Sequence, residues 1–173
     1  MTTKEYVEHS KANGVTICDI FHSSKYEISS TKGVTENKNK DLSSIAPINV
    51  SGGVKLIPGS LGLYKIEMKP GDGVEYKLKK YLKLKKEDYD YVIIDTPPTP
   101  SVWMASSLIA SDYYLIPVKP DPLSITGIDL LDSIINEKRD NFDLEISCAG
   151  VVFNLVDTDK LHRESRGFFS SHP

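Results

Sequence analysis

The stretch Tyr89-Asp90-Tyr91-Val92-Ile93-Ile94-Asp95-Thr96-Pro97-Pro98 decides the fold class of this 173-residue chain. Its four consecutive apolar residues, 91–94, are typical of a strand that is buried on both faces of a parallel sheet. The acid Asp95 follows at once, at the strand end where an α/β sheet collects its ligands. A carboxylate there can hold Mg²⁺ or the water around it. An Asp that opens a turn or caps the next helix would give the same local pattern.

The second half of the chain alternates apolar runs with helical spacing. Strands are predicted at residues 113–118 and 148–153, and helices at residues 102–110 and around residues 128–135. The candidate N-caps of the second helix are Ser124 and Asp121. This alternation predicts the α/β class, with a mainly parallel sheet and helices on both of its faces in three layers.

The first half is less regular. We expect a short helix at residues 15–21, a short strand at 54–57 and an amphipathic helix over 74–82. Polar residues dominate 22–52 and 158–173, which predicts a long mobile loop and a tail within a single domain that spans the whole chain. The outer face of the amphipathic helix is basic, with Lys77, Lys79, Lys80, Lys83, Lys85 and Lys86. A solvated face explains these lysines better than DNA binding does.

Composition narrows the class of protein further. The formal net charge of -3 and the pI near 5.8 give no overall attraction to nucleic acid or anionic membrane. Cys18 and Cys148 have neither the number nor the spacing of a disulfide framework or a zinc site. The sequence has no signal-peptide core and no apolar run long enough for a membrane span. We therefore expect a cytoplasmic protein.

Three segments in the same order resemble the ParA/Soj/MinD ATPases. They are residues 89–98 quoted above, then Leu115-Ile116-Pro117-Val118-Lys119-Pro120, then Gly150-Val151-Val152-Phe153-Asn154. Residues 15–21 are similar to the helix after the second strand of that family, and residues 54–59 to its third strand. The resemblance covers most of residues 15–165 and is most specific at residues 89–98.

The resemblance implies a deviant Walker A P-loop ATPase that dimerises around ATP and Mg²⁺ and binds DNA without sequence preference. Plasmid or chromosome partition is the implied role, with a homodimer, a full-length ParA-like protein and a centromere-binding protein as implied partners. Asp95 matches the Walker B acid, the implied catalytic and metal-binding residue, with Thr96 beside it at the nucleotide. Asn154 matches the position that reads the adenine edge, although a polar residue that satisfies a loop backbone is an equal alternative. The spacing from Asn154 to Asp157 is similar to the Asn-x-x-Asp base-reading motif of GTPases, but four residues at a strand end are weak evidence for it.

The chain departs from the family pattern at the phosphate-binding loop. Gly52-Gly53 and Gly71-Asp72-Gly73 are the close-spaced glycines, and neither has the lysine or the strand–loop–helix context of a P-loop, so both are predicted to be turns. In this family the P-loop strand lies beside the Asp95 strand. Without it we expect an incomplete sheet, in which each buried backbone group without a partner costs about 1–3 kcal/mol.

Three hypotheses follow. The first is a fragment of a ParA-type ATPase that is inactive alone, and the alternative is a non-catalytic truncated relative that binds and modulates a full-length ATPase. The third, an unrelated enzyme that uses Asp95 or a histidine, is weaker because the histidines lie in polar segments: His9, His22, His162 and His172.

Overall fold

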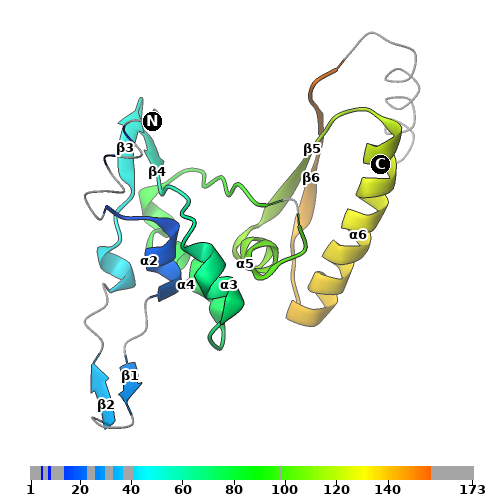
Figure 1. The fold of residues 1–173 in the computed structure, drawn as a ribbon. Coiled ribbons are helices and arrows are strands. Elements are labelled where there is room, and N and C mark those ends of the chain that lie inside the picture. Colours follow the sequence, from blue (N-terminus) through cyan, green and yellow to red (C-terminus); the bar gives the residue numbers. More distant parts are fainter. Residues whose placement is uncertain are drawn as a thin grey trace. The chain divides into compact units, whose positions relative to one another are not determined.

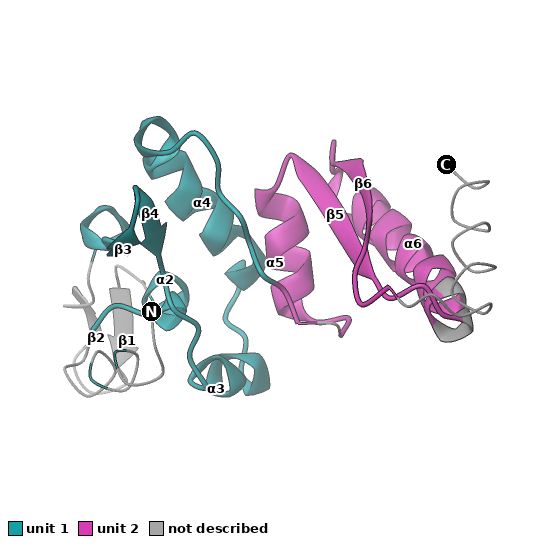
Figure 2. Cartoon of the chain, turned by 90° about the horizontal axis from the view of Figure 1, so that it is seen from above, with its two compact units in different colours: residues 1–95 teal, residues 96–173 magenta. Residues whose placement is uncertain are grey.

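The computed structural model describes residues 5, 8, 14–22, 26–29, 33–36, 41–97 and 99–156. The chain forms two compact units, Met1–Asp95 and Thr96–Pro173 (Figure 2). Each unit has its own elements and its own buried residues, and each is described by itself. The expectation of a single domain over the whole chain stays a prediction.

The first unit is built around short helices. They are α2 (Ile17–His22), α3 (Leu63–Met68) and α4 (Lys77–Leu84) (Figure 1). Three 3-10 turns accompany them: η1 (Leu42–Ser44), η2 (Val74–Tyr76) and η3 (Lys86–Asp88). Helix α2 packs against α3 and α4. Their buried side chains include Ile20, Ile66, Leu78 and Tyr81. The helices predicted at 15–21 and 74–82 are therefore confirmed, because apolar residues at helical spacing form one buried face.

Two antiparallel hairpins complete the described part of this unit. Strand β1 (Tyr26–Ser29) pairs with β2 (Gly33–Glu36), and β3 (Ile48–Ser51) pairs with β4 (Val54–Leu56). Gly52 and Gly53 form the second turn with φ of 57° and 82°, a backbone conformation that glycine adopts without strain. Where the sequence predicted one loop over 22–52, the chain contains β1, β2, η1 and β3. Hydrogen bonding across a hairpin gives these polar residues a structure that hydrophobic periodicity does not reveal.

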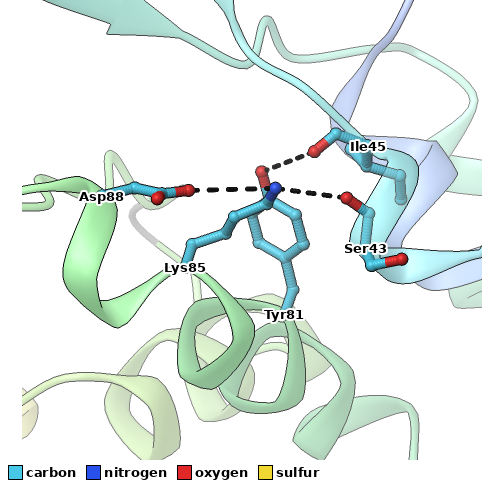
Figure 3. A network of polar contacts seen from close by, with 5 residues as sticks. All are labelled: Ser43, Ile45, Tyr81, Lys85 and Asp88. Carbon is cyan, nitrogen blue, oxygen red and sulfur yellow. Dashed lines mark hydrogen bonds and ion pairs between the residues drawn. The ribbon is translucent and has the colours of Figure 1, made fainter.

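A polar network ties α4 to the segment before β3 (Figure 3). The Tyr81 hydroxyl donates to the carbonyl oxygen of Ile45 at 3.2 Å. The Lys85 ammonium donates to the carbonyl oxygen of Ser43 at 3.2 Å and lies 3.9 Å from the Asp88 carboxylate. Burial raises the pKa of Tyr81 to about 12, with smaller contributions from Tyr89 and Asp88. These contacts hold residues 43–45 against helix α4 and the residue after it, 36 and 42 positions later in the sequence.

The second unit contains a two-stranded parallel sheet and two helices. Strand β5 (Tyr113–Val118) pairs with β6 (Ser147–Phe153), and α5 (Val102–Ala110) and α6 (Pro122–Phe142) are the helices (Figure 1). Met104 and Leu108 of α5 form a core with Ile135 of α6 and with Ile146, and this core contacts further side chains at its edge: Tyr114, Leu131, Ile134 and Leu144. The predicted helices and parallel strands of this half are confirmed, and the fold class is α/β as predicted.

Helix α6 begins where its sequence predicts. The Asp121 side chain accepts a hydrogen bond from the Ser124 backbone N–H at 2.9 Å, and Pro122 occupies the first turn. Of the two candidate caps, Asp121 is the one used. Proline in the first turn costs no hydrogen bond, because the first N–H groups of a helix have no partner within it.

The prediction of a buried strand at residues 91–94 is wrong for this structure. These residues belong to no strand, and the side chains of Tyr91 and Ile93 are 91% and 94% exposed. A strand forms only by hydrogen bonding to a neighbouring strand, and within the described residues no strand pairs with this segment. The apolar run indicates a sheet interior, but the described chain does not provide that sheet.

Candidate functional site

Asp95 closes the first unit, directly after the apolar residues 91–94. Its side chain is exposed, and within the described residues its carboxylate has neither a hydrogen bond nor an ion pair. Oxygen ligands of this kind suit Mg²⁺, so an exposed carboxylate without a competing cation fits the metal that the resemblance implies. Thr96 and Pro97 follow as exposed residues at the start of the second unit. Pro98 lies outside the described residues.

A groove of about 410 Å³ opens beside Asp95 within the first unit. Residues 91–95 form one wall, and helices α2 and α4 contribute apolar side chains such as Ile20, Leu78 and Tyr81. Lys55 of β4 also lines it, with its ammonium 5.2 Å from the centre of the Tyr89 ring. Sequence reasoning missed the contact between Lys55 and Tyr89, because only the tertiary structure brings a hairpin lysine to this aromatic ring.

Asn154 follows β6 in the second unit and makes the last backbone hydrogen bond between β6 and β5. Its backbone N–H donates to the Val118 carbonyl oxygen at 2.8 Å, and its side-chain oxygen accepts from the Leu155 N–H, also at 2.8 Å. Leu155 has φ of 51°, which is unusual for a leucine. The side-chain oxygen of Asn154 therefore stabilises a strained turn. Asn154 thus has the role that the sequence analysis gave as the alternative to nucleotide binding, namely satisfying a loop backbone. Contact between Asn154 and adenine stays a prediction. Asp157 lies outside the described residues.

The end of strand β5 leads directly into the start of helix α6. Val118 is followed by Lys119 and by the fully buried Pro120, and the Asp121 N–H donates to the Lys119 carbonyl oxygen at 2.8 Å. Asp121 itself is the N-cap of α6. The residues after β5 thus position helix α6, and we assign no ligand to this end of the strand.

The lysines of α4 do not form one uniform basic face. The Lys77 ammonium donates to the Phe21 carbonyl oxygen, and burial, with the nearby Lys80 as a lesser cause, lowers the pKa of Lys77. Lys85 is held by Ser43 and Asp88. The exposed members are Lys79, Lys80, Lys83 and Lys86. Two of the six lysines therefore bind other parts of the protein, and only the four exposed lysines are available to contact nucleic acid.

Neither a cluster of metal ligands nor a membrane-spanning helix occurs among the described residues. Among the described residues, no group of three or more His, Cys, Asp or Glu side chains could hold a metal ion by itself. In that same part of the chain, no helix has the length and apolar character that crossing a membrane requires. A Mg²⁺ ion at Asp95 would therefore need further ligands from water or from nucleotide phosphate, as is usual for Mg²⁺.

Sequence comparison finds curated relatives, some of which are named as chromosome-partitioning proteins. The uncharacterized protein MJECL24 of Methanocaldococcus jannaschii is 36% identical over 110 residues, which are 62% of this chain and 42% of that protein. The sporulation initiation inhibitor protein Soj of Bacillus subtilis strain 168 is 28% identical over 119 residues, 68% of this chain and 47% of Soj. This chain thus spans less than half the length of these two relatives.

Structure comparison points to the same fold. A plasmid partition protein from Borrelia burgdorferi superposes with a TM-score of 0.73 at 21% identity, over 98% of this chain and 67% of that one. Cobyrinic acid a,c-diamide synthase from Mycobacterium smegmatis, with a bound ATP analog and magnesium, gives 0.69 at 24% identity, over 77% of this chain and 56% of that one. At such identities the likeness concerns the fold alone.

The family assignment rests on a match to a domain model. The AAA domain model AAA_31 matches residues 5–147, which is most of the chain and includes Asp95. Together with Soj and the partition-protein fold, this match confirms the resemblance recognised at residues 89–98. The chain belongs to the AAA domain family AAA_31 and, within it, to the ParA-type P-loop ATPases.

Proposed function

We propose that this chain supplies the Asp95 side of the nucleotide site of a ParA-type partition ATPase. The observation that carries the proposal is Asp95 itself, an exposed carboxylate without a partner in the described residues, placed directly after an apolar segment. Similarity to relatives that are named as chromosome-partitioning proteins supports a role in plasmid or chromosome partition. The proposal includes ATP and Mg²⁺ as ligands and a cytoplasmic location.

Each candidate residue has a distinct part in this proposal. Asp95 holds Mg²⁺ or its water, Thr96 lies beside it, and Asn154 contacts the adenine edge. Bound Mg²⁺ would neutralise charge on the phosphate oxygens of ATP. Phosphates also need backbone N–H groups at a helix N-terminus, and the 173 residues contain no glycine- and lysine-rich loop of that kind. We therefore expect no nucleotide turnover by these residues alone.

The proposed partners are those of a partition ATPase. They are a second copy or a full-length ParA-like protein, non-specific DNA and a centromere-binding protein. The exposed lysines of α4 are the surface on which DNA contact would be tested first, because salt-dependent binding to phosphate needs accessible cations. Lys77 is not part of that surface, since it donates to Phe21.

The test is calorimetry with AMPPNP and Mg²⁺. The 173-residue chain is compared with a fusion in which a phosphate-binding loop from a ParA-type relative precedes residue 1. We expect binding by the fusion only, weakened about tenfold or more by Asp95→Asn and unchanged by Asp72→Asn, an exposed acid in the Gly71–Gly73 turn. Magnesium-dependent binding that ignores Asp95 would refute the proposed role of this carboxylate.

The groove beside residues 91–95 favours a second candidate function. A non-catalytic module that binds a full-length ATPase would present an accessible apolar surface, and this groove is one. Co-purification with a full-length ParA-type protein tests this alternative, and a chain that stays monomeric and without partners at high concentration would remove it.

A further inference from the structure

Strand β6 contains one residue more than the length of β5 that it pairs with. Tyr114 pairs with Cys148, but the next residue of β5, Leu115, pairs with Gly150. Ala149 is thus the extra residue of a β-bulge. Bulges are rare in parallel pairs, and they are frequent beside active sites, where they change the direction of the side chains that follow.

Gly150 permits this bulge through its backbone. Its φ is 140°, a value that glycine adopts freely and that residues with a Cβ avoid. Space is not the reason for glycine here, because a Cβ on Gly150 would meet no heavy atom within 4 Å beyond its chain neighbours. Only the backbone conformation therefore excludes a side chain at this position.

The bulge decides which residue lies at the end of β6. Val118 pairs with Phe153, and the next N–H group, that of Asn154, donates to the Val118 carbonyl oxygen at 2.8 Å. Without the bulge, regular pairing from Cys148 onward would match Val118 with Val152. Asn154 would then lie one residue, about 3.3 Å, beyond this hydrogen bond, and its side chain would project from the other face of the sheet.

Packing of the core favours the same register. Val118 is 7% exposed and its partner Phe153 is partly buried, whereas Val152 is 46% exposed. A regular strand would exchange Phe153 for the smaller Val152 beside Val118. The bulge therefore serves both the core and the position of Asn154, and an experiment on ligand binding is needed to separate the two roles.

We propose that Gly150 is a positioning residue for Asn154. By permitting the bulge, Gly150 sets the level and the face of the sheet at which the Asn154 side chain is held. The side-chain oxygen of Asn154 accepts from the Leu155 N–H at 2.8 Å, which leaves its NH₂ group to donate to a base. The contact with adenine rests on the function proposed above, whereas the control of register does not. Gly150 itself contacts no nucleotide and acts only through the strand.

The first test measures amide hydrogen exchange in the 173-residue chain without nucleotide. In Gly150→Ala we expect the Asn154 and Leu155 amides to exchange at least about tenfold faster, relative to the Leu108 amide of α5, because their acceptors depend on the register. Gly127→Ala is the matched control and should leave this ratio unchanged. A Cβ at this exposed glycine would have the same free space, but the backbone there is helical.

A compensating deletion keeps the test decisive if Gly150→Ala alone folds poorly. Deleting Ala149 removes the extra residue, so regular pairing again places Asn154 beside Val118 and position 150 no longer needs a positive φ. The deletion combined with Gly150→Ala should therefore restore slow exchange at Asn154. Equal acceleration at Leu108 in Gly150→Ala, or no rescue by the deletion, would overturn the proposal.

The second test separates the positioning role from general stability. The fusion with a phosphate-binding loop is titrated with Mg²⁺ and either AMPPNP or tripolyphosphate, which has phosphates but no base. Gly150→Ala should weaken AMPPNP about tenfold or more, change tripolyphosphate less than about twofold, and add no further loss to Asn154→Ala. Equal losses for the two ligands would overturn the positioning role. A parent fusion that does not bind AMPPNP would refute the proposed function instead, and the exchange results would still decide whether Gly150 positions Asn154.

Discussion

The hydroxyl of Tyr81 donates to the carbonyl oxygen of Ile45 at 3.2 Å, and both residues are almost completely buried. The bond joins α4 to a segment 36 residues earlier in the chain. Ile45 has no exposed surface at all, so its carbonyl oxygen depends on a protein donor rather than on water. This pair fixes the segment that leads into the β3–β4 hairpin.

Replacing Tyr81 by phenylalanine should destabilise the first unit by about 1 kcal/mol, because it removes the donor and leaves the Ile45 carbonyl oxygen unsatisfied. Urea unfolding followed by far-UV circular dichroism measures the change. Tyr76→Phe is the matched control, since Tyr76 is 40% exposed, and it should be close to neutral. Equal effects of the two substitutions would contradict the importance of the buried bond.

Alkaline pH should weaken the same contact. The pKa of Tyr81 is about 12 in the folded chain, mainly because of burial, against 10.0 for an ordinary tyrosine. The folded state therefore holds this proton more tightly than the unfolded state, and the stabilisation is complete below pH 10 and lost as the pH rises toward 12. Stability measured between these pH values should fall less steeply in Tyr81→Phe than in the unchanged chain. Parallel pH profiles would show that Tyr81 does not contribute.

The sequence predicted those elements whose determinants are local. Residues 102–110 and 113–118 were predicted as helix and strand, and α5 and β5 have these same bounds. Ser101 caps α5 by accepting from the Met104 N–H at 3.4 Å, which is a signal that lies within four residues of sequence. The resemblance to the family is likewise most specific in one short run, residues 89–98.

The failures concern structure that depends on neighbours. Residues 91–94 have the composition of a buried strand, yet no described strand pairs with them, and Tyr91 and Ile93 are 91% and 94% exposed. Hairpin β1–β2 lies where a loop was predicted, since its pairing follows from cross-strand hydrogen bonds rather than from an apolar pattern. Lys55 approaches Tyr89 although the two residues are 34 positions apart in the sequence, so no local sequence pattern could predict their contact.

Removing the cap of α6 should cost about 1 kcal/mol in the second unit. The Asp121 side chain accepts from the Ser124 N–H at 2.9 Å, and Asp121→Ala leaves that donor without its partner. Asp121→Asn keeps an acceptor and should lose much less. Trp103 is the single tryptophan and is buried in α5, so its fluorescence during urea unfolding reports on this unit. An alanine variant as stable as the asparagine variant would show that the bond is unimportant.

The core of the second unit depends on Ile135, which is 3% exposed and lies with Met104, Leu108 and Ile146. Ile135→Ala should destabilise this unit by about 2–5 kcal/mol, through lost burial and the cavity left behind. Leu130 lies on the same helix but is 62% exposed, so Leu130→Ala serves as the control and should change little. Trp103 fluorescence during urea unfolding measures the stability of both variants. A similar loss of stability in the two variants would show that Ile135 is not a special part of the core.

Asn154 separates a structural role from a role in nucleotide binding. Its side-chain oxygen accepts from the Leu155 N–H at 2.8 Å, where Leu155 has φ of 51°. Asn154→Asp keeps an acceptor for this N–H but removes the amide donor that an adenine edge would need. We therefore expect Asn154→Asp to retain stability by Trp103 fluorescence while AMPPNP affinity of the fusion with a phosphate-binding loop falls about tenfold or more. Asn154→Ala should lose both stability and affinity. Unchanged affinity in Asn154→Asp would mean that this residue serves only the turn at the end of β6.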